Sequence, residues 1–107
     1  MKTFKDLKVG DYIHIVGYLC GGYMQSLLID AIENNGEYLL LTTTDGKQFE
    51  VTPNETNDWS NEHFVDVYVD ENDAWAMVQA HDKHYAAQIK KIGWEELHAS
   101  GSERVSL

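Results

Sequence analysis

Two histidines offer the most direct route to metal chemistry in this chain. His81 and His84 lie three residues apart, and residues with that spacing share one face of a helix. A third ligand would have to come from His63, Glu62 or Asp82. Zinc sites normally show tighter ligand motifs, and the same pattern is typical of surface histidines beside a helix cap. We therefore expect no metal or other cofactor, and a small metal-dependent enzyme using His81 and His84 is an alternative.

The single cysteine is a candidate nucleophile. Cys20 follows His14 in the chain and precedes Gly21 and Gly22. A catalytic thiol needs a positioned base and a lowered pKa, and the sequence indicates neither. The chain also lacks a Gly-x-Ser-x-Gly motif, a phosphate loop and a dinucleotide fingerprint. These observations favour a non-enzymatic protein, and a lone cysteine is typical of a reducing, cytoplasmic protein without disulfides.

Negative charge is concentrated in the middle third of the chain. The formal net charge is −10, and the range from Gln48 to Asp82 contains no Lys or Arg. The acids of that range are Glu50, Glu55, Asp58, Glu62, Asp66, Asp70, Glu71, Asp73 and Asp82. Such a field repels nucleic acids and membrane surfaces and attracts basic partners.

Aromatic residues are frequent, with six Tyr, three Trp and three Phe. Exposed aromatic rings can stack on single-stranded nucleic acid. However, the eight basic residues are scattered, whereas phosphate binding needs clustered Lys or Arg. We therefore expect no direct nucleic-acid binding. We also expect no membrane association, because the chain has no long apolar run and its first residues lack the apolar core of a signal peptide.

The acidic range is the best candidate for a binding surface. Same-face residues on a strand lie ~6.5–7 Å apart, a spacing broadly similar to that of successive phosphates along a nucleic-acid strand. Acids on a rigid sheet can therefore engage an Arg/Lys-rich surface, although acids on a solvated face also serve solubility alone. The predicted partner-binding residues are Asp58, Trp59, Glu62, Asp66, Tyr68, Asp70, Glu71 and Asp73.

The hypothesis that follows is an acidic protein that binds a basic, nucleic-acid-handling protein. It would act as an inhibitor, decoy or immunity-type partner by occupying the surface that nucleic acid otherwise uses. A second alternative is an accessory ligand-binding barrel with its site at the glycine-rich loop 17–23 and the surrounding aromatic residues. That alternative predicts an apolar pocket there.

The elements that position these residues begin with a turn and a strand. Gly10-Asp11 suits a tight turn, and Ile13 and Ile15 then alternate with their neighbours at the period of a strand. The stretch from Leu7 to Val16 resembles the opening of SH3-like small barrels, in which a Leu-x-x-Gly-Asp turn precedes an aliphatic strand. Phe4 and Leu7 are expected to anchor this lead-in to the core.

The residue pattern in the middle of the chain predicts a three-stranded meander over residues 27–51. Met24 to Glu33 matches both a strand and a helix by spacing, and we favour the strand because hairpin signals follow it. Residues 38–44 are rich in strand-forming residues, and Asp45-Gly46 is a strong hairpin turn before residues 47–52. The helix over Met24 to Glu33 stays an alternative.

The residue pattern in the last part of the chain predicts a loop, two strands and a helix. Residues 53–61 read as an exposed polar loop carrying Trp59, residues 63–70 as a strand, 71–73 as a turn and 74–80 as a partner strand. Asp82 suits the N-cap of a helix over 82–92. The whole is predicted to be mainly β: one domain over 1–98, a small antiparallel SH3-like barrel or bent sheet of five or six strands with one C-terminal helix, and a loose tail over 99–107.

Overall fold

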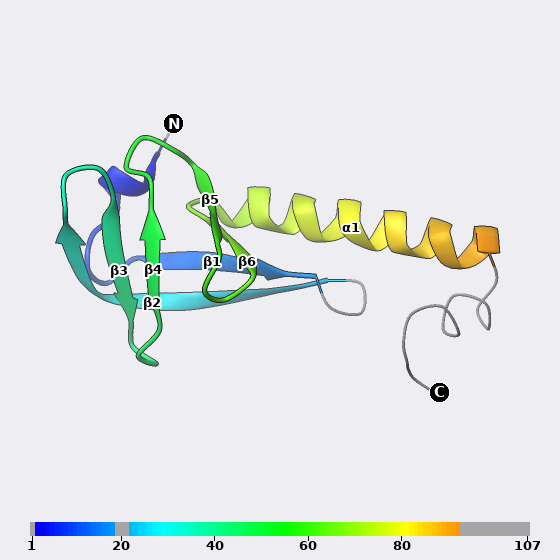
Figure 1. Ribbon diagram of the computed structural model, residues 1–107, viewed down its shortest axis with the longest axis horizontal. Coiled ribbons are helices and arrows are strands. Elements are labelled where there is room, and N and C mark those ends of the chain that lie inside the picture. Colours follow the sequence, from blue (N-terminus) through cyan, green and yellow to red (C-terminus); the bar gives the residue numbers. More distant parts are fainter. Residues whose placement is uncertain (1, 19–21, 93–107) are drawn as a thin grey trace.

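The fold is mainly β with one C-terminal helix, as the sequence predicts (Figure 1). A computed structural model describes residues 2–18 and 22–92, with side chains as far as His84. The described elements are η1 (Phe4–Asp6), β1 (Tyr12–Gly17), β2 (Tyr23–Asn34), β3 (Leu39–Thr43), β4 (Gln48–Val51), β5 (Asn57–Ser60), β6 (Val65–Tyr68) and α1 (Glu71–Ile92). The six described strands form one antiparallel, nearly closed sheet in the order β4-β3-β2-β1-β6-β5.

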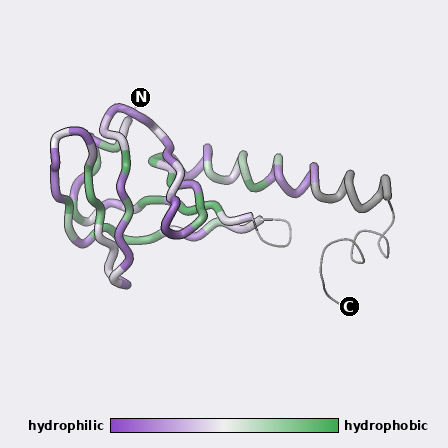
Figure 2. The backbone as a smooth tube through the Cα atoms, viewed as in Figure 1, coloured by the Kyte–Doolittle hydropathy of each residue, from purple (hydrophilic) through white to green (hydrophobic). Residues whose placement is uncertain are grey.

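The core fills the inside of this curved sheet. Alternate residues of the strands point inward, as the period of a strand requires, and Figure 2 shows hydrophobic stretches along β1, β2 and β3. Hydrophilic residues gather in the connecting turns. The main cluster of buried hydrophobic residues consists of Phe4, Leu7, Ile13, Ile15, Leu27, Ile29, Leu39, Leu41, Phe49, Val51, Val65, Val67 and Val69.

The predicted turn and lead-in are confirmed. Gly10 has a φ of 98°, which is the left-handed region that favours glycine, and its N–H donates to the Ile29 carbonyl at 3.0 Å. Phe4 and Leu7 are both buried. The Phe4 N–H donates to the carbonyl of Glu55 at 3.0 Å, so η1 is tied to the segment between β4 and β5.

The meander is confirmed as well. Residues Met24 to Glu33 belong to the strand β2, whose first part pairs with β1 and whose second part pairs with β3. The register shifts between Ile29 and Ala31 in β2, at the point where the strand passes from one partner to the other. Gly46, with a φ of 88°, makes the β3–β4 hairpin turn.

The loop predicted over residues 53–61 is wrong at its second half. Residues 57–60 form β5, which pairs with β6 so that Trp59 lies opposite Asp66 and Ser60 opposite Val65. This pairing depends on backbone hydrogen bonds, so the polar composition of the segment hides it. The strand predicted over 63–70 is correspondingly shorter, because Phe64 turns the chain with a φ of 56°.

The helix begins at residue 71, so the predicted turn over 71–73, the strand over 74–80 and the cap at Asp82 are wrong. Asp70 is the cap instead: its carboxylate accepts from the Asp73 N–H at 3.0 Å and its carbonyl from the Ala74 N–H at 3.2 Å. Ala74 and Val78 are buried against the sheet. Residues four apart share a helix face and also match the period of a strand, so the alternation misled the prediction.

Figure 1 shows α1 starting beside β5 and β6 and running away from the barrel. Within the described residues, no helix is both long enough and apolar enough to cross a membrane. The predicted domain end at 98, the tail over 99–107 and Cys20 lie outside the described residues.

The cap at Asp70 can be tested by substitution. We expect Asp70→Ala to lower the free energy of unfolding by about 1 kcal/mol, because the Asp73 N–H loses its acceptor. Asp70→Asn keeps a side-chain oxygen, so it should lose less. Urea denaturation followed by circular dichroism measures both. Equal stability of Asp70→Ala and the wild type would contradict the assigned start of α1.

Candidate binding surface

The barrel is closed by side chains at the seam between β4 and β5, which are the two ends of the strand order. Asp58 Oδ2 accepts from the Thr52 N–H at 2.8 Å and from the Thr52 hydroxyl at 2.9 Å. Nearer the β5–β6 turn, His63 Nε2 donates to the Gln48 carbonyl at 3.1 Å, and the His63 ring lies 4.8 Å from that of Phe49, centroid to centroid. These contacts hold two edge strands together where the strand order ends.

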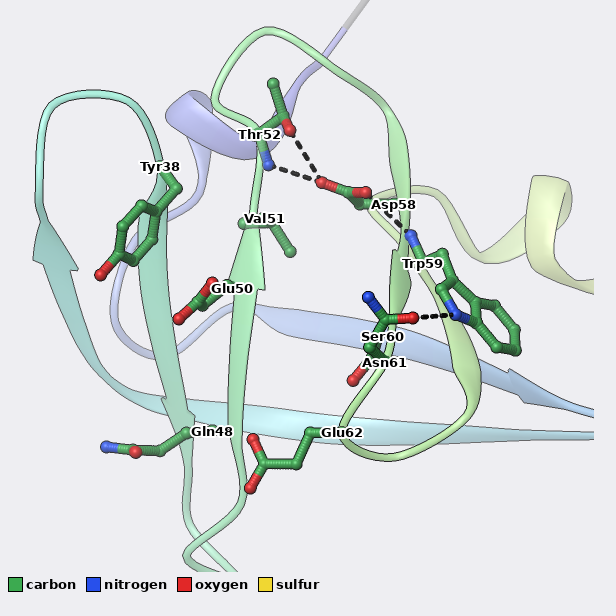
Figure 3. Close-up of a pocket in the computed structure, with 10 residues that line it drawn as sticks. All are labelled: Tyr38, Gln48, Glu50, Val51, Thr52, Asp58, Trp59, Ser60, Asn61 and Glu62. Atoms are coloured by element: carbon green, nitrogen blue, oxygen red, sulfur yellow. Dashed lines mark hydrogen bonds between the residues drawn. The ribbon is translucent and has the colours of Figure 1, made fainter.

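A polar groove of about 360 Å³ runs along the seam between these contacts. We call it the acidic groove; Figure 3 shows its ten lining residues. Glu50 extends into it from β4 and Glu62 from the β5–β6 turn, while Asp58, Tyr38 and Trp59 complete its walls (Figure 3). The described residues that line the groove include no Lys or Arg. The groove is therefore suited to a cationic group.

Asp66 and Tyr68, which the sequence placed on the binding surface, are largely covered. The Tyr18 hydroxyl donates to the Asp66 carboxylate. Burial, with that hydrogen bond as the next cause, raises the pKa of Tyr18 far above its usual value, so the phenol stays protonated. Tyr68 is only 7% exposed, because Ala74 and Val78 of α1 pack over it. Tyr68 therefore offers little contact area to a partner, and the carboxylate of the half-buried Asp66 is already engaged by Tyr18.

Three further acids of the predicted surface lie at the start of α1. Asp70, Glu71 and Asp73 are exposed, and Asp70 and Asp73 line a hollow with Lys2. Negative charge in the first turn also stabilises a helix through its dipole. The predicted residues thus separate into two groups. The seam group is Asp58, Trp59 and Glu62, and the helix group is Asp70, Glu71 and Asp73. Asp66 and Tyr68 lie between the two groups along the chain.

The sequence missed an exposed aromatic cluster beside the seam. Phe64, Tyr23 and Trp59 are 73%, 45% and 44% exposed. They border a mainly apolar depression of about 490 Å³, the aromatic hollow, which is lined by Gly17, Tyr18, Tyr23, Trp59, His63, Phe64 and Val65. The accessory-barrel alternative predicts an apolar pocket in this region, and the hollow adjoins both ends of the loop 17–23.

Phe64 is also held in a costly backbone conformation. Its φ of 56° lies in the left-handed region, which is unfavourable by roughly 1–2 kcal/mol for a residue with a side chain and is rare for bulky residues. No sequence signal indicated this, because glycine and asparagine are the usual residues in that conformation.

Glu50 is a further site residue that the sequence did not single out. It was counted among the acids of the range, but its position in the groove depends on closure of the barrel.

Of the two histidines proposed as metal ligands, His84 is exposed and His81 contacts an aromatic ring. His81 packs edge-on against Tyr18, with 5.0 Å between ring centroids. His63, the candidate third ligand, is occupied at Gln48 and Phe49. Among the side chains that the structure describes, in residues 2–18 and 22–84, no group of three or more His, Cys, Asp or Glu is placed to hold a metal ion.

Comparison with known proteins returned no match: no protein-family model, no curated protein and no solved structure resembles this chain closely enough to count. The function is therefore inferred from the charges, contacts and hollows of the structure itself.

The closure of the seam by Asp58 generates a stability prediction. Asp58→Ala removes the acceptor of both Thr52 donors, and we expect the free energy of unfolding to fall by about 1–2 kcal/mol. Glu62→Ala removes an exposed acid that lines the same groove but makes no hydrogen bond with Thr52, and it should change stability by less than about 0.5 kcal/mol. Denaturant unfolding of the two variants measures the difference. Equal losses would show that Asp58 does not hold the seam.

His14 generates a pH prediction. It is 8% exposed on β1, and its Nδ1 lies 2.7 Å from the Ser26 hydroxyl. Burial lowers the pKa of His14, against the opposing fields of Glu71 and Asp70. Between the lowered pKa and the unfolded value of about 6.5, the unfolded chain binds more protons, so stability falls as the pH drops below about 6.5.

His14→Gln keeps a polar group for Ser26 but does not titrate. We therefore expect the wild type to lose more stability than His14→Gln between pH 7.5 and pH 5, as measured by urea unfolding at each pH. Parallel curves for the two proteins would contradict a lowered pKa at His14.

Proposed function

We propose that this protein is not an enzyme and that it binds a basic, nucleic-acid-handling protein through the acidic range from Gln48 to Asp82. The observation that carries the proposal is charge segregation: this range holds nine acids and no Lys or Arg. Ordinary protein surfaces intersperse both signs, so a single-sign field over a third of a small chain is more than solubility requires.

The exposed members of the range support the proposal. Glu50 and Glu62 lie across the acidic groove from one another, and Glu71 and Asp73 lie in the first turn of α1. All four are exposed. Their backbones belong to the barrel, its turns and a helix, so a partner meets charges whose positions are already set. Preorganised charges lower the ordering cost of association.

The mechanism that follows is competition. A rigid array of carboxylates attracts the Lys/Arg surface with which the partner holds nucleic acid and blocks it, which is an inhibitor, decoy or immunity-type role. Exposed charges steer association but are screened by salt, so binding should weaken as ionic strength rises. The lone Cys20 leads us to place this interaction in a reducing, cytoplasmic setting.

The test compares two triple variants of equal net charge. Glu62→Gln, Glu71→Gln and Asp73→Asn neutralise the proposed surface. Asp30→Asn, Glu33→Gln and Glu37→Gln neutralise exposed acids of β2 and of the β2–β3 turn. At about 0.5 kcal/mol per exposed charge, the first triple should weaken partner binding roughly tenfold at ~0.1 M salt. The second should leave it nearly unchanged.

The partner is first captured from an extract of the source cells on the immobilised protein, eluted with salt and identified by mass spectrometry. Affinities of both triples for that purified partner are then measured by calorimetry, and displacement of its nucleic acid by fluorescence anisotropy. A partner that is not basic, or equal weakening by both triples, would contradict the proposed surface.

A further inference from the structure

Trp59 lies at the border of two hollows of different chemistry. It is a lining residue of the acidic groove, with Glu50 and Glu62, and also of the aromatic hollow, with Tyr23 and Phe64. We infer that the two hollows together receive one short segment of the basic partner, in which a large apolar side chain stands next to a Lys or Arg. This inference rests on the proposed function and adds to it a specific recognition element.

The aromatic hollow suits an apolar group because its lining is mainly apolar and three of its polar side chains are already hydrogen-bonded. The Tyr18 hydroxyl donates to Asp66, His63 Nε2 to the Gln48 carbonyl, and Trp59 Nε1 to the Asn61 side-chain oxygen at 3.0 Å (Figure 3). A polar ligand would therefore find few free partners there. An aliphatic or aromatic side chain would bury apolar surface of its own and of the three exposed rings.

The ring of Phe64 is exposed even though its backbone adopts an unfavourable conformation. Its backbone is in the left-handed region, yet its ring gains little burial in return, being 73% exposed. A backbone conformation of this kind persists only when the surrounding structure enforces it, and such residues gather at binding sites. Here Phe64 follows the β5–β6 turn, whose N–H groups at His63 and Phe64 are held by the Ser60 side chain and carbonyl.

Tyr23 forms the far wall of the hollow by lying against a glycine. A methyl group at Gly17 would overlap the Tyr23 ring, whereas the ring can swing outward because it is half exposed. Gly17 therefore allows the ring to lie against the strand. Gly17→Ala should displace this one wall and leave Trp59 and Phe64 in place.

Charge decides which partner the hollow fits. Glu62 lines the acidic groove, with its carboxylate 4.0 Å from Nε2 of His63, a residue that also lines the aromatic hollow. Glu50 and Asp58 lie in the same acidic groove. An apolar side chain in the hollow would thus place the neighbouring residue of its chain near carboxylates and near the Trp59 ring face, which also favours a cation.

The experiment uses the full chain, labelled with ¹⁵N, and three synthetic peptides. The first is Gly-Arg-Trp-Arg-Gly, the second replaces Trp by Ser, and the third replaces both Arg by Gln. Chemical-shift titration detects weak binding and locates it. We expect the first peptide to bind at least tenfold more tightly than either of the others and to shift the signals of the Trp59 indole N–H, Phe64 and Gly17.

Variants then test the aromatic wall. Phe64→Asn keeps a residue that tolerates the left-handed region but removes the ring, so binding of the first peptide should fall at least fivefold while the thermal unfolding midpoint stays equal or rises. Gly17→Ala should weaken binding to a lesser degree. Val9→Asn, at an exposed apolar residue that does not line the hollow, is the control and should bind as the wild type does.

Each other outcome overturns the inference in a distinguishable way. Equal binding of the Trp and Ser peptides, or none at millimolar concentration, removes the apolar anchor but leaves the charge-based function standing. Equal binding of the Gln peptide indicates an uncharged apolar ligand instead. Line broadening that grows with protein concentration and disappears in Phe64→Asn indicates a second copy of this chain as the occupant. If Phe64→Asn binds the partner as the wild type does, while the triple variant Glu62→Gln, Glu71→Gln, Asp73→Asn binds it weakly, only this inference is wrong and the proposed function stands.

Discussion

The closure of the barrel without a complete hydrogen-bond ladder is the constraint on which the rest of the structure depends. Between β4 and β5, side chains of Asp58 and His63 replace strand pairing. Full pairing would have removed both strand edges and left a continuous wall. The side-chain closure instead leaves a groove between Glu50 and Glu62, and places Trp59 at the border between polar and aromatic surface.

The acids of the middle third serve two purposes that the structure separates. Asp58, Asp66 and Asp70 accept hydrogen bonds that fix the seam, the Tyr18 side chain and the helix start. Glu50 and Glu62 instead extend into the groove (Figure 3). Net charge alone does not distinguish these groups. Their separation explains how a chain can concentrate negative charge in one range and still fold, since several of the carboxylates are stabilised locally by hydrogen bonds from N–H and O–H donors.

Sequence patterns predicted the strands with clear hydrophobic alternation and failed where a polar segment forms a strand or where distant contacts decide. Ile13 and Ile15 indicated β1 correctly, and Asp45-Gly46 indicated the β3–β4 hairpin. Ala74 and Val78 fit a strand and a helix equally well, and only contact with Tyr68 and Val16 selects the helix. The candidate site shows the same limit. Trp59 was recognised as exposed, whereas Phe64 could not be, because its backbone conformation contradicts the preference of its residue type.

The pairing of β1 has a consequence for how the chain folds. One edge of β1 meets β2 through a short connection, but the other meets β6, with His14 opposite Tyr68. Pairing of β1 with β6 closes a loop of most of the barrel, and the entropy cost of that closure precedes the favourable contacts. Local β2–β3–β4 pairing should therefore form earlier. During synthesis, β1 therefore keeps one open edge until residues 65–68 have left the ribosome. An open strand edge can pair with another chain. The yield of folded protein should therefore fall as the local concentration of nascent chains rises.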